Sequence, residues 1–255
     1  MSTLILVPAP LDFGCETQAP ITDVLPLATI QTASRITHWI AENAKSCRAV
    51  IKRIGEVQTL TLPLQQHIIT ELPRDVHKKG DHGGRFDAKP LLQTALQKAK
   101  TDGAEVIGLI SEAGMPAVAD PGSSVVRAAH ALGITVQPLV GPSSLLLALA
   151  ASGQNGQNFT FLGYLPIEAT ERIQRIRALE VIAKKTGQTQ LFIEVPHRNA
   201  ALWQALLSSL QPGTYLSAAS GLSLPVTQIF SATVADWKHR AAPSAQLPCV
   251  MAIGV

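Results

Sequence analysis

The segment from Ile110 to Gly122 most constrains what this chain can fold into. It reads Ile-Ser-Glu-Ala-Gly-Met-Pro-Ala-Val-Ala-Asp-Pro-Gly, and it joins an apolar run, Val106 to Ile110, to apolar residues at helical spacing that begin after Ser123. A strand, a long loop and a helix in this order predict one unit of an open α/β sheet. Ligands of such sheets bind beyond the carboxyl ends of the strands. Glycines in this loop would let a ligand approach the main chain, and prolines would hold the loop's shape.

Beyond this segment, strands and helical patterns alternate up to about residue 211, and strands dominate after it. This order predicts an α/β fold with a mixed sheet in the second half. The chain has 255 residues, 46% of them hydrophobic and 15% charged, which excludes a disordered protein and allows two domains. Because the composition becomes more regular after the central loop, we predict an N-terminal α/β domain at residues 1–116 and a C-terminal α/β domain at 117–255.

Hydrophobic periodicity predicts the individual elements. Strands are expected at 4–7, 57–62, 106–110, 134–140, 159–165, 190–195, 215–220, 228–233 and 249–255. Helices are expected at 27–45, 91–100, 123–132, 145–151, 168–185 and 197–210. Ser143 is placed as the N-cap of the helix at 145–151, where free backbone N–H groups could also meet a ligand.

Membrane and metal sites are not expected. The longest apolar runs, such as 145–151, are far too short to span a bilayer, and the first residues have no basic stretch typical of a signal peptide. We therefore expect a cytoplasmic protein. The three cysteines and seven histidines lack metal-ligand spacing, and the pair His77 and His82 is a poor zinc candidate. Nucleotide-binding glycine motifs and hydrolase elbows are absent from the sequence.

Two polar segments fit either a solvated surface or a binding surface. Residues 71–89 contain glycines, histidines and basic residues, which is typical of a solvated loop but also of a lid or an anion-binding loop. The helix at 168–185 carries Arg172, Arg175, Arg177, Lys184 and Lys185. These side chains either form a solvated face with Glu171 and Glu180 or contact RNA phosphates. The net charge of +3 permits an anionic partner without requiring one.

Four blocks of sequence carry a resemblance to a known family. They are residues 111–122, Val140-Gly-Pro-Ser-Ser144, Phe161-Leu-Gly-Tyr-Leu-Pro166 and Phe192-Ile-Glu-Val-Pro-His-Arg198. In this order and at these separations they resemble the tetrapyrrole methylase superfamily. The most similar subfamily methylates a cytidine ribose 2′-oxygen in small-subunit ribosomal RNA. The resemblance implies a homodimer of two α/β domains, with S-adenosylmethionine bound in a cleft between the domains.

The resemblance also implies which residues bind this cofactor. They are Pro8, Ser111, Glu112, Ala113, Gly114, Ala117, Val118, Ser143, Ser144, Leu162 and Glu194. A zwitterionic ligand with a flat adenine needs backbone donors, backbone acceptors and apolar walls more than a charged clamp, which agrees with this set. No catalytic residue is assigned. Alignment of the methyl acceptor would supply most of the catalysis, assisted by a general base.

Three departures from the subfamily pattern bear on function. Its Pro-Thr-Pro-Ile-Gly-Asn-Leu is here Pro8-Ala-Pro10-Leu-Asp-Phe-Gly14, its Glu-Asp-Thr-Arg is matched to Ile30-Gln-Thr-Ala33, and its Arg-Glu-Leu-Thr-Lys is matched to 219–224 without any charge. Such residues are natural candidates for placing RNA or moving a proton. Three functions therefore stay open: an S-adenosylmethionine-dependent methyltransferase acting on RNA, a non-catalytic relative that binds the cofactor, and a methyltransferase for a small, tetrapyrrole-type molecule.

Overall fold

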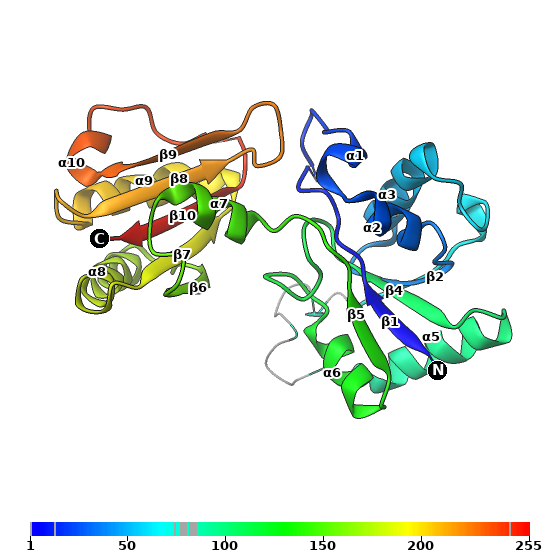
Figure 1. Cartoon of the computed structure of the whole chain (residues 1–255). Helices are drawn as coiled ribbons and strands as arrows, with labels where there is room; N and C mark the ends of the chain where they lie inside the picture. The colour runs from blue at the N-terminus through cyan, green and yellow to red at the C-terminus, as the bar shows by residue number, and fades with distance from the viewer. Residues whose placement is uncertain (1, 13, 74, 77–80, 82–85, 245) are drawn as a thin grey trace. The chain divides into compact units, whose positions relative to one another are not determined.

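The computed structural model describes residues 2–12, 14–73, 75–76, 81, 86–244 and 246–255 (Figure 1). The chain divides into two compact units, Met1–Ser143 and Ser144–Val255. Each unit contains one five-stranded sheet, which confirms the expected α/β class.

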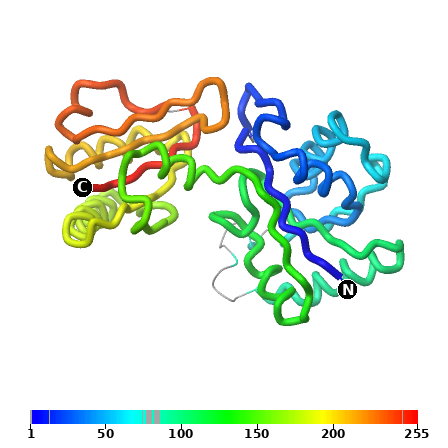
Figure 2. Tube along the Cα trace, in the orientation of Figure 1, coloured from blue at the N-terminus to red at the C-terminus, as the bar shows by residue number. Residues whose placement is uncertain are grey.

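The sheet of the first unit has the strand order β3-β2-β4-β1-β5. Its strands are β1 (Thr3–Leu6), β2 (His38–Ala41), β3 (Ile68–Glu71), β4 (Val106–Ile110) and β5 (Thr135–Pro138). All neighbouring pairs are parallel, and Thr3 pairs with both Val106 and Thr135. The N-terminal strand thus lies between two segments more than a hundred residues away, as the blue and green traces of Figure 2 show. Because the strands are parallel, the loops that follow them leave the sheet at one edge.

The first unit ends later in the chain than the predicted boundary between residues 116 and 117, because β5 belongs to its sheet. After the central loop, the chain forms α6 (Ser123–Ala131) and returns as β5 to pair with β1. The first unit therefore extends to Ser143. A composition change within the loop carries no information about this return, because β5 and β1 pair over a distance of more than a hundred residues.

Helices cover both faces of the first sheet. They are α1 (Ile21–Val24), α2 (Leu27–Ala33), α3 (Ala44–Val57), the 3-10 turn η1 (Leu64–Gln66), α5 (Lys89–Thr101) and α6. Trp39 belongs to the core cluster formed with α2 and α3, whereas its neighbour Ile40 belongs to the cluster formed with α5 and α6. This alternation follows from the strand geometry, which points successive side chains to opposite faces.

Two predictions in the first unit are wrong. The helix expected at 27–45 is interrupted: α2 ends at Ala33, β2 follows, and α3 begins at Ala44. All four residues of β2 are buried, so apolar and polar residues do not alternate along the strand. Read together with α2, its apolar residues mimic helical spacing. The strand expected at 57–62 is absent from this described segment, where α3 ends and Leu60 packs against the α2–α3 core from a loop. Strand β3 was not predicted.

The sheet of the second unit has the strand order β6-β7-β10-β8-β9. Its strands are β6 (Phe159–Tyr164), β7 (Thr189–Glu194), β8 (Tyr215–Ser220), β9 (Gln228–Thr233) and β10 (Cys249–Gly254). Strands β6 and β7 are parallel, while β10 runs antiparallel to β7 and β8, and β9 antiparallel to β8. The prediction of a mixed sheet in the second half is thus confirmed.

Within the described residues of this unit, four helices accompany the sheet: α7 (Ser144–Ser152), α8 (Ala169–Thr186), α9 (Pro196–Ser209) and α10 (Val234–Trp237). Helices α8 and α9 share one core cluster with Phe192 and Met251 of the sheet. Trp203 and Trp237 meet edge to face in this cluster, with ring centroids 4.7 Å apart. Throughout the described part of the chain, no helix has both the length and the apolar character needed to cross a membrane.

Candidate functional site

The loops that follow β1 and β4 are tied together by their backbones. The N–H of Ala9 donates to the carbonyl oxygen of Gly114 over 2.8 Å, and the N–H of Gly114 donates to the carbonyl oxygen of Ala9 over 3.0 Å. Together these bonds form an isolated antiparallel bridge. The structure therefore brings together the predicted cofactor residues Pro8 and Ser111–Gly114, although they are about a hundred residues apart in the sequence.

The loop after β5 lies against the same bridge. A Cβ atom on Gly141 would be 2.3 Å from Pro8 Cβ, and the carbonyl oxygen of Pro142 is 3.7 Å from the place where a Cβ of Gly114 would be. The hydroxyl of Thr29 in α2 holds this loop by donating to the carbonyl oxygen of Val140 over 2.7 Å. Three loops thus meet at the carboxyl edge of the first sheet, and only glycine fits where they approach most closely.

The loop after β4 has an unusual backbone. Gly114 and Ala117 both have φ 66°, and Ala119 also has φ 66°. Alanine rarely adopts this left-handed conformation, which costs roughly 1–2 kcal/mol, and strain of this kind concentrates at functional sites. Ser111 is buried and its hydroxyl donates to the carbonyl oxygen of Ala113, while Val118 is exposed. The loop therefore presents backbone groups and one apolar side chain, as the expected cofactor would require.

Three carboxylates gather at the base of this loop. Glu42 follows β2, and its Oε2 accepts from the backbone N–H of Glu112 over 3.2 Å. Asp120 completes the group. Burial, and then the negative charges of Glu42 and Glu112, raise the pKa of Asp120 to about 7, although a hydrogen bond from Ser111 opposes the shift. Sequence reasoning missed this cluster because it placed Glu42 inside a helix.

One predicted departure from the subfamily pattern, Ile30-Gln-Thr-Ala33, lies in α2. Ile30 and Ala33 are buried in the core there. Glu42, which follows β2, supplies an acidic side chain beside the loop after β4 instead.

Asp81 joins the segment 71–89 to the beginning of α6. Its carboxylate accepts from the N–H groups of Gly122 and Ser124, each over 2.8 Å, and from the hydroxyls of Ser123 and Ser124, each over 2.7 Å. Burial raises the pKa of Asp81, but these four hydrogen bonds together lower it by more. The net pKa of Asp81 is therefore below its usual value. The histidines His77 and His82, together with the basic residues and glycines between 74 and 85, lie outside the described residues.

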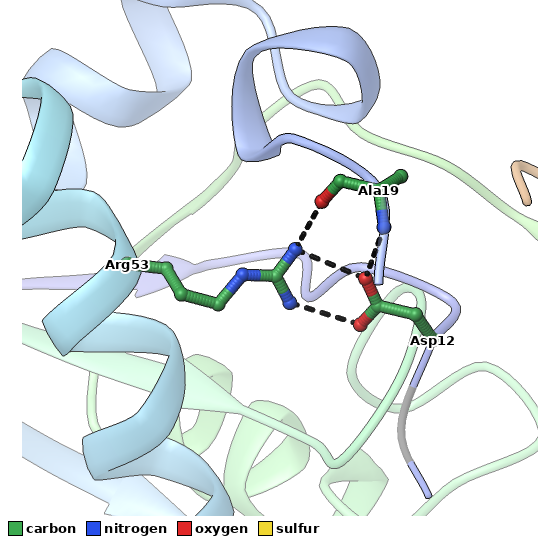
Figure 3. A network of polar contacts seen from close by, with 3 residues as sticks. All are labelled: Asp12, Ala19 and Arg53. Carbon is green, nitrogen blue, oxygen red and sulfur yellow. Dashed lines mark hydrogen bonds and ion pairs between the residues drawn. The ribbon is translucent and has the colours of Figure 1, made fainter. Parts of the chain in front are cut away.

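A groove of about 1150 Å³ runs between the segment 10–22 and one side of α3. Its wall is fixed by Arg53, which binds both carboxylate oxygens of Asp12 at 2.9 Å and donates to the carbonyl oxygen of Ala19 over 2.6 Å. Figure 3 shows this network, closed by a hydrogen bond from Ala19 N to Asp12. Glu112 of the β4 loop lines the groove as well. No sequence signal pointed to the groove, because residues 11–25 have no regular pattern.

Of the remaining predicted cofactor residues, Ser143 ends the first unit, and the others belong to the second unit. Ser143 directly precedes α7, whose first residue is Ser144. Leu162 is partly buried against the core of that unit, beside an irregularity in the pairing of β6 with β7. Glu194 is buried and accepts from Arg198 Nε over 2.8 Å and from the N–H of Val195 over 2.9 Å. The structure thus gives Glu194 a partner within its own unit.

The basic side chains predicted on α8 differ in their surroundings, and Lys185 is exposed. Arg172 is half-buried and donates to the carbonyl oxygen of Ile167 over 3.0 Å. Lys184 forms an ion pair of 3.2 Å with Glu180, as the helical spacing predicted. Arg175 and Arg177 are exposed. Glu171 is exposed and has no ion pair within the described part of the chain.

Comparisons with known proteins agree with this architecture. The family model for Tetrapyrrole (Corrin/Porphyrin) Methylases matches residues 28–237. In fold, the chain is similar to diphthine synthase, with a TM-score of 0.59, 13% identity and coverage of 99% of this chain and 90% of that one. It is also similar to a putative cobalamin synthesis related protein (CobF) from Corynebacterium diphtheriae, with a TM-score of 0.57, 12% identity and coverage of 99% and 97%.

Curated relatives share more of the sequence over a shorter length. Ribosomal RNA small subunit methyltransferase I from Pseudomonas aeruginosa is 38% identical over 141 residues, which are 54% of this chain and 45% of the relative. The protein of the same name from Xylella fastidiosa is 44% identical over 96 residues, or 38% and 34% of the two chains. The chain spans about half the length, or less, of these relatives. Because the family model covers most of the sequence, the chain belongs to the tetrapyrrole (corrin/porphyrin) methylase family.

Proposed function

We propose that this protein is an S-adenosylmethionine-dependent methyltransferase that acts on RNA. The observation that carries the proposal is the backbone bridge between Ala9 and Gly114, which joins two loops of the expected cofactor site. The relatives named as ribosomal RNA small subunit methyltransferase I support both the reaction and the class of substrate.

The β4 loop would hold the cofactor through its backbone. Between Ser111 and Gly114, the backbone groups that the Ala9–Gly114 bridge and the bond to Glu42 leave available would bind the amino acid end of the cofactor. Val118 offers an exposed apolar side chain. Ala117 keeps its backbone in a conformation that the surrounding loop must maintain. Cofactor binding by Ser143, Ser144, Leu162 and Glu194 stays a prediction.

The cofactor supplies an activated methyl group, and the chain's own residues would orient the acceptor beside it. Orientation removes much of the entropic barrier of such a transfer. Asp120 is our candidate for the group that takes the acceptor's proton, because a carboxyl with a pKa of about 7 changes protonation near neutral pH.

A specific observation keeps a non-catalytic relative as the second candidate. The segment 219–224, where the subfamily carries three charges, is uncharged and largely buried here, with Ser220, Leu222 and Leu224 each less than a tenth exposed. The hydroxyls of Ser220 and Ser223 have no hydrogen-bond partner within the described residues. A protein of this kind would bind the cofactor and transfer no methyl group.

Isothermal titration with S-adenosylmethionine, followed by transfer of tritiated methyl to ribosomal RNA and to small-molecule pools, tests the proposal. Gly114→Val should abolish cofactor binding, because its side chain would occupy the space that the backbone approach requires. Gly133→Val is the matched control, since Gly133 has the same φ of 66° but no atom within 4 Å of its Cβ position. Both variants carry the same backbone strain. Weaker cofactor binding by Gly114→Val than by Gly133→Val would therefore show that the cofactor binds at the loop of Gly114.

Each outcome separates the candidates. Absence of cofactor binding by the wild type contradicts the proposal, and binding without any transfer supports the non-catalytic relative. Transfer to small molecules alone would replace RNA by a tetrapyrrole-type acceptor. Equal dissociation constants for wild type and folded Gly114→Val would show that the cofactor binds elsewhere.

The proposal includes a cytoplasmic homodimer. The relatives are named for methylating ribosomal RNA, which supports a cytoplasmic location. The family resemblance supports the homodimer. Light scattering at micromolar concentration should give twice the mass of 27.0 kDa. A monomer mass under these conditions would contradict the dimer.

A further inference from the structure

We propose that the groove between the segment 10–22 and α3 binds single-stranded RNA, with Lys45 and Lys52 in contact with its phosphates. This inference rests on the proposed function and names the place on the first unit where the methyl acceptor binds. The cofactor residues expected from the sequence do not account for the groove: of its lining residues, only Glu112 belongs to that set.

The size of the groove fits a ligand larger than a metabolite fragment. Its volume of about 1150 Å³ lies above the usual range of roughly 300–1000 Å³ for small-molecule pockets. It is also open along α3, from Asn43 at the N-terminal end to Val57 at the C-terminal end. An open groove of this length suits a chain that passes through it.

The wall of the groove is built before any ligand arrives. Arg53, from α3, bonds to both Asp12 and Ala19 and so holds these two residues beside the helix. Both carboxylate oxygens of Asp12 and the carbonyl oxygen of Ala19 are occupied by this one guanidinium. A wall fixed in advance lowers the entropy that binding must overcome. Because Arg53 is committed to the wall, the cations available to a ligand are the lysines.

Lys45 and Lys52 are exposed on the side of α3 that lines the groove. Their ammonium groups form no ion pair within the described residues. They are two helical turns apart, which places them on one face of α3 at a spacing of about 10 Å along its axis. Two separate cations on one face match a ligand with repeated negative charges better than a single anion.

The carboxylates of the groove argue for nucleotides over a simple polyanion. Glu16, Glu56 and Glu112 also line it, so the groove is not uniformly basic. Carboxylates accept hydrogen bonds from the exocyclic amino groups of bases, and lysines meet phosphates. Single-stranded RNA presents both groups, since its base edges are unpaired.

One end of the groove reaches the candidate cofactor loop. Glu112 lines the groove and belongs to the β4 loop, and its backbone N–H is held by Glu42. Pro10 lines the groove and follows Ala9, which forms the bridge to Gly114. A strand bound along α3 would therefore end beside the backbone that is expected to hold the methyl donor.

Filter binding of a single-stranded fragment of small-subunit ribosomal RNA between about 50 and 200 mM salt tests this site. The variant Lys45→Gln/Lys52→Gln should flatten the logarithmic salt dependence by about 1.4, because each single-strand phosphate contact contributes about 0.7. This decrease of about 1.4 in the salt dependence corresponds to an affinity for RNA about 25-fold weaker than that of the wild type at 0.1 M salt. Lys98→Gln/Lys100→Gln is the matched control, since these lysines lie in the last turn of α5 and do not line the groove. The control should keep wild-type affinity.

Protection of Cys15 gives a second measurement that needs no substitution. Cys15 is half-buried and lines the groove, whereas Cys47 and Cys249 are buried and serve as internal controls. Saturating RNA should slow alkylation of Cys15 by iodoacetamide at least severalfold. An unchanged alkylation rate would overturn the site.

The remaining outcomes distinguish this site from the proposed function. Equal affinity losses in the two lysine variants would overturn the groove while leaving RNA as the substrate class. A wild type that binds S-adenosylmethionine but no RNA would overturn both the groove and the RNA acceptor, and leave the methyltransferase reaction intact. Unchanged cofactor binding in Lys45→Gln/Lys52→Gln, together with weaker RNA binding, would support the assignment.

Discussion

The guanidinium of Arg53 meets the carboxylate of Asp12 at two points, with Nη1 2.9 Å from Oδ1 and Nη2 2.9 Å from Oδ2. The side chains are 15% and 4% exposed, so this pair is largely withdrawn from water. Paired geometry of this kind is the strong form of a charge-assisted hydrogen bond. The pair connects α3 to the loop that follows β1.

Breaking this pair should destabilise the first unit. We expect Arg53→Met and Asp12→Asn each to lower the free energy of unfolding by about 3 kcal/mol, because each leaves a buried polar partner without its bonds. The double variant should lose less than the sum of the two, since neither charge then remains unpaired. Urea unfolding of the four proteins measures this. Strictly additive losses would mean that the two side chains do not interact.

Gly141 sets how closely the β5 loop approaches the β1 loop. A Cβ at this position would lie 2.3 Å from Pro8 Cβ and Cγ, which no packed structure tolerates. We expect Gly141→Ala to lower the free energy of unfolding by about 1–3 kcal/mol and to weaken cofactor binding, because Pro8 must move. Gly156→Ala is the control, with nothing within 4 Å of its Cβ position. Thermal unfolding and titration with S-adenosylmethionine should separate the two variants.

Asp120 should make the stability of the protein depend on pH. Burial, followed by the charges of Glu42 and Glu112, raises the pKa of Asp120 from 3.8 to about 7 on folding. The protonated carboxyl therefore stabilises the fold fully below about pH 4, and this contribution is lost as the pH rises through about 7. We expect the melting temperature of Asp120→Asn to equal that of the wild type near pH 4 and to exceed it increasingly up to about pH 8.

The control for this prediction is Asp23→Asn. Asp23 lies on the short helix α1 and is exposed, far in sequence from the three carboxylates of the site. Melting curves of this variant should stay parallel to those of the wild type between pH 4 and 8. If the difference in melting temperature between Asp120→Asn and the wild type does not widen with pH, Asp120 is ionised throughout that range.

From β4 onward, the apolar pattern of the sequence predicted nearly every element. The helices predicted at 168–185 and 197–210 form as α8 (Ala169–Thr186) and α9 (Pro196–Ser209). Long elements of this kind repeat their apolar residues often enough for the period to be unambiguous. The strand, loop and helix around 110–122 were likewise readable, because Gly and Pro mark the loop and apolar runs flank it.

Between residues 27 and 71 local pattern was insufficient. Strand β2 is only four residues long and buried throughout, so nothing in its own sequence distinguishes it from a turn of helix. Its burial arises from β3 and β4, which pair with it on either side. The neighbours therefore decided its conformation, and with it the position of Glu42 at the edge of the sheet.

The contacts of the candidate site depend on which strands become neighbours in the sheet. Asp12 and Arg53 are 41 residues apart, and Glu42 and Glu112 are 70 apart. Periodicity reports which face of an element is apolar, but it carries no information on which strands become neighbours. The order β4-β1-β5 brings the loops after those strands to one edge, and this order places Gly141 against Pro8 and Gly114 against Ala9.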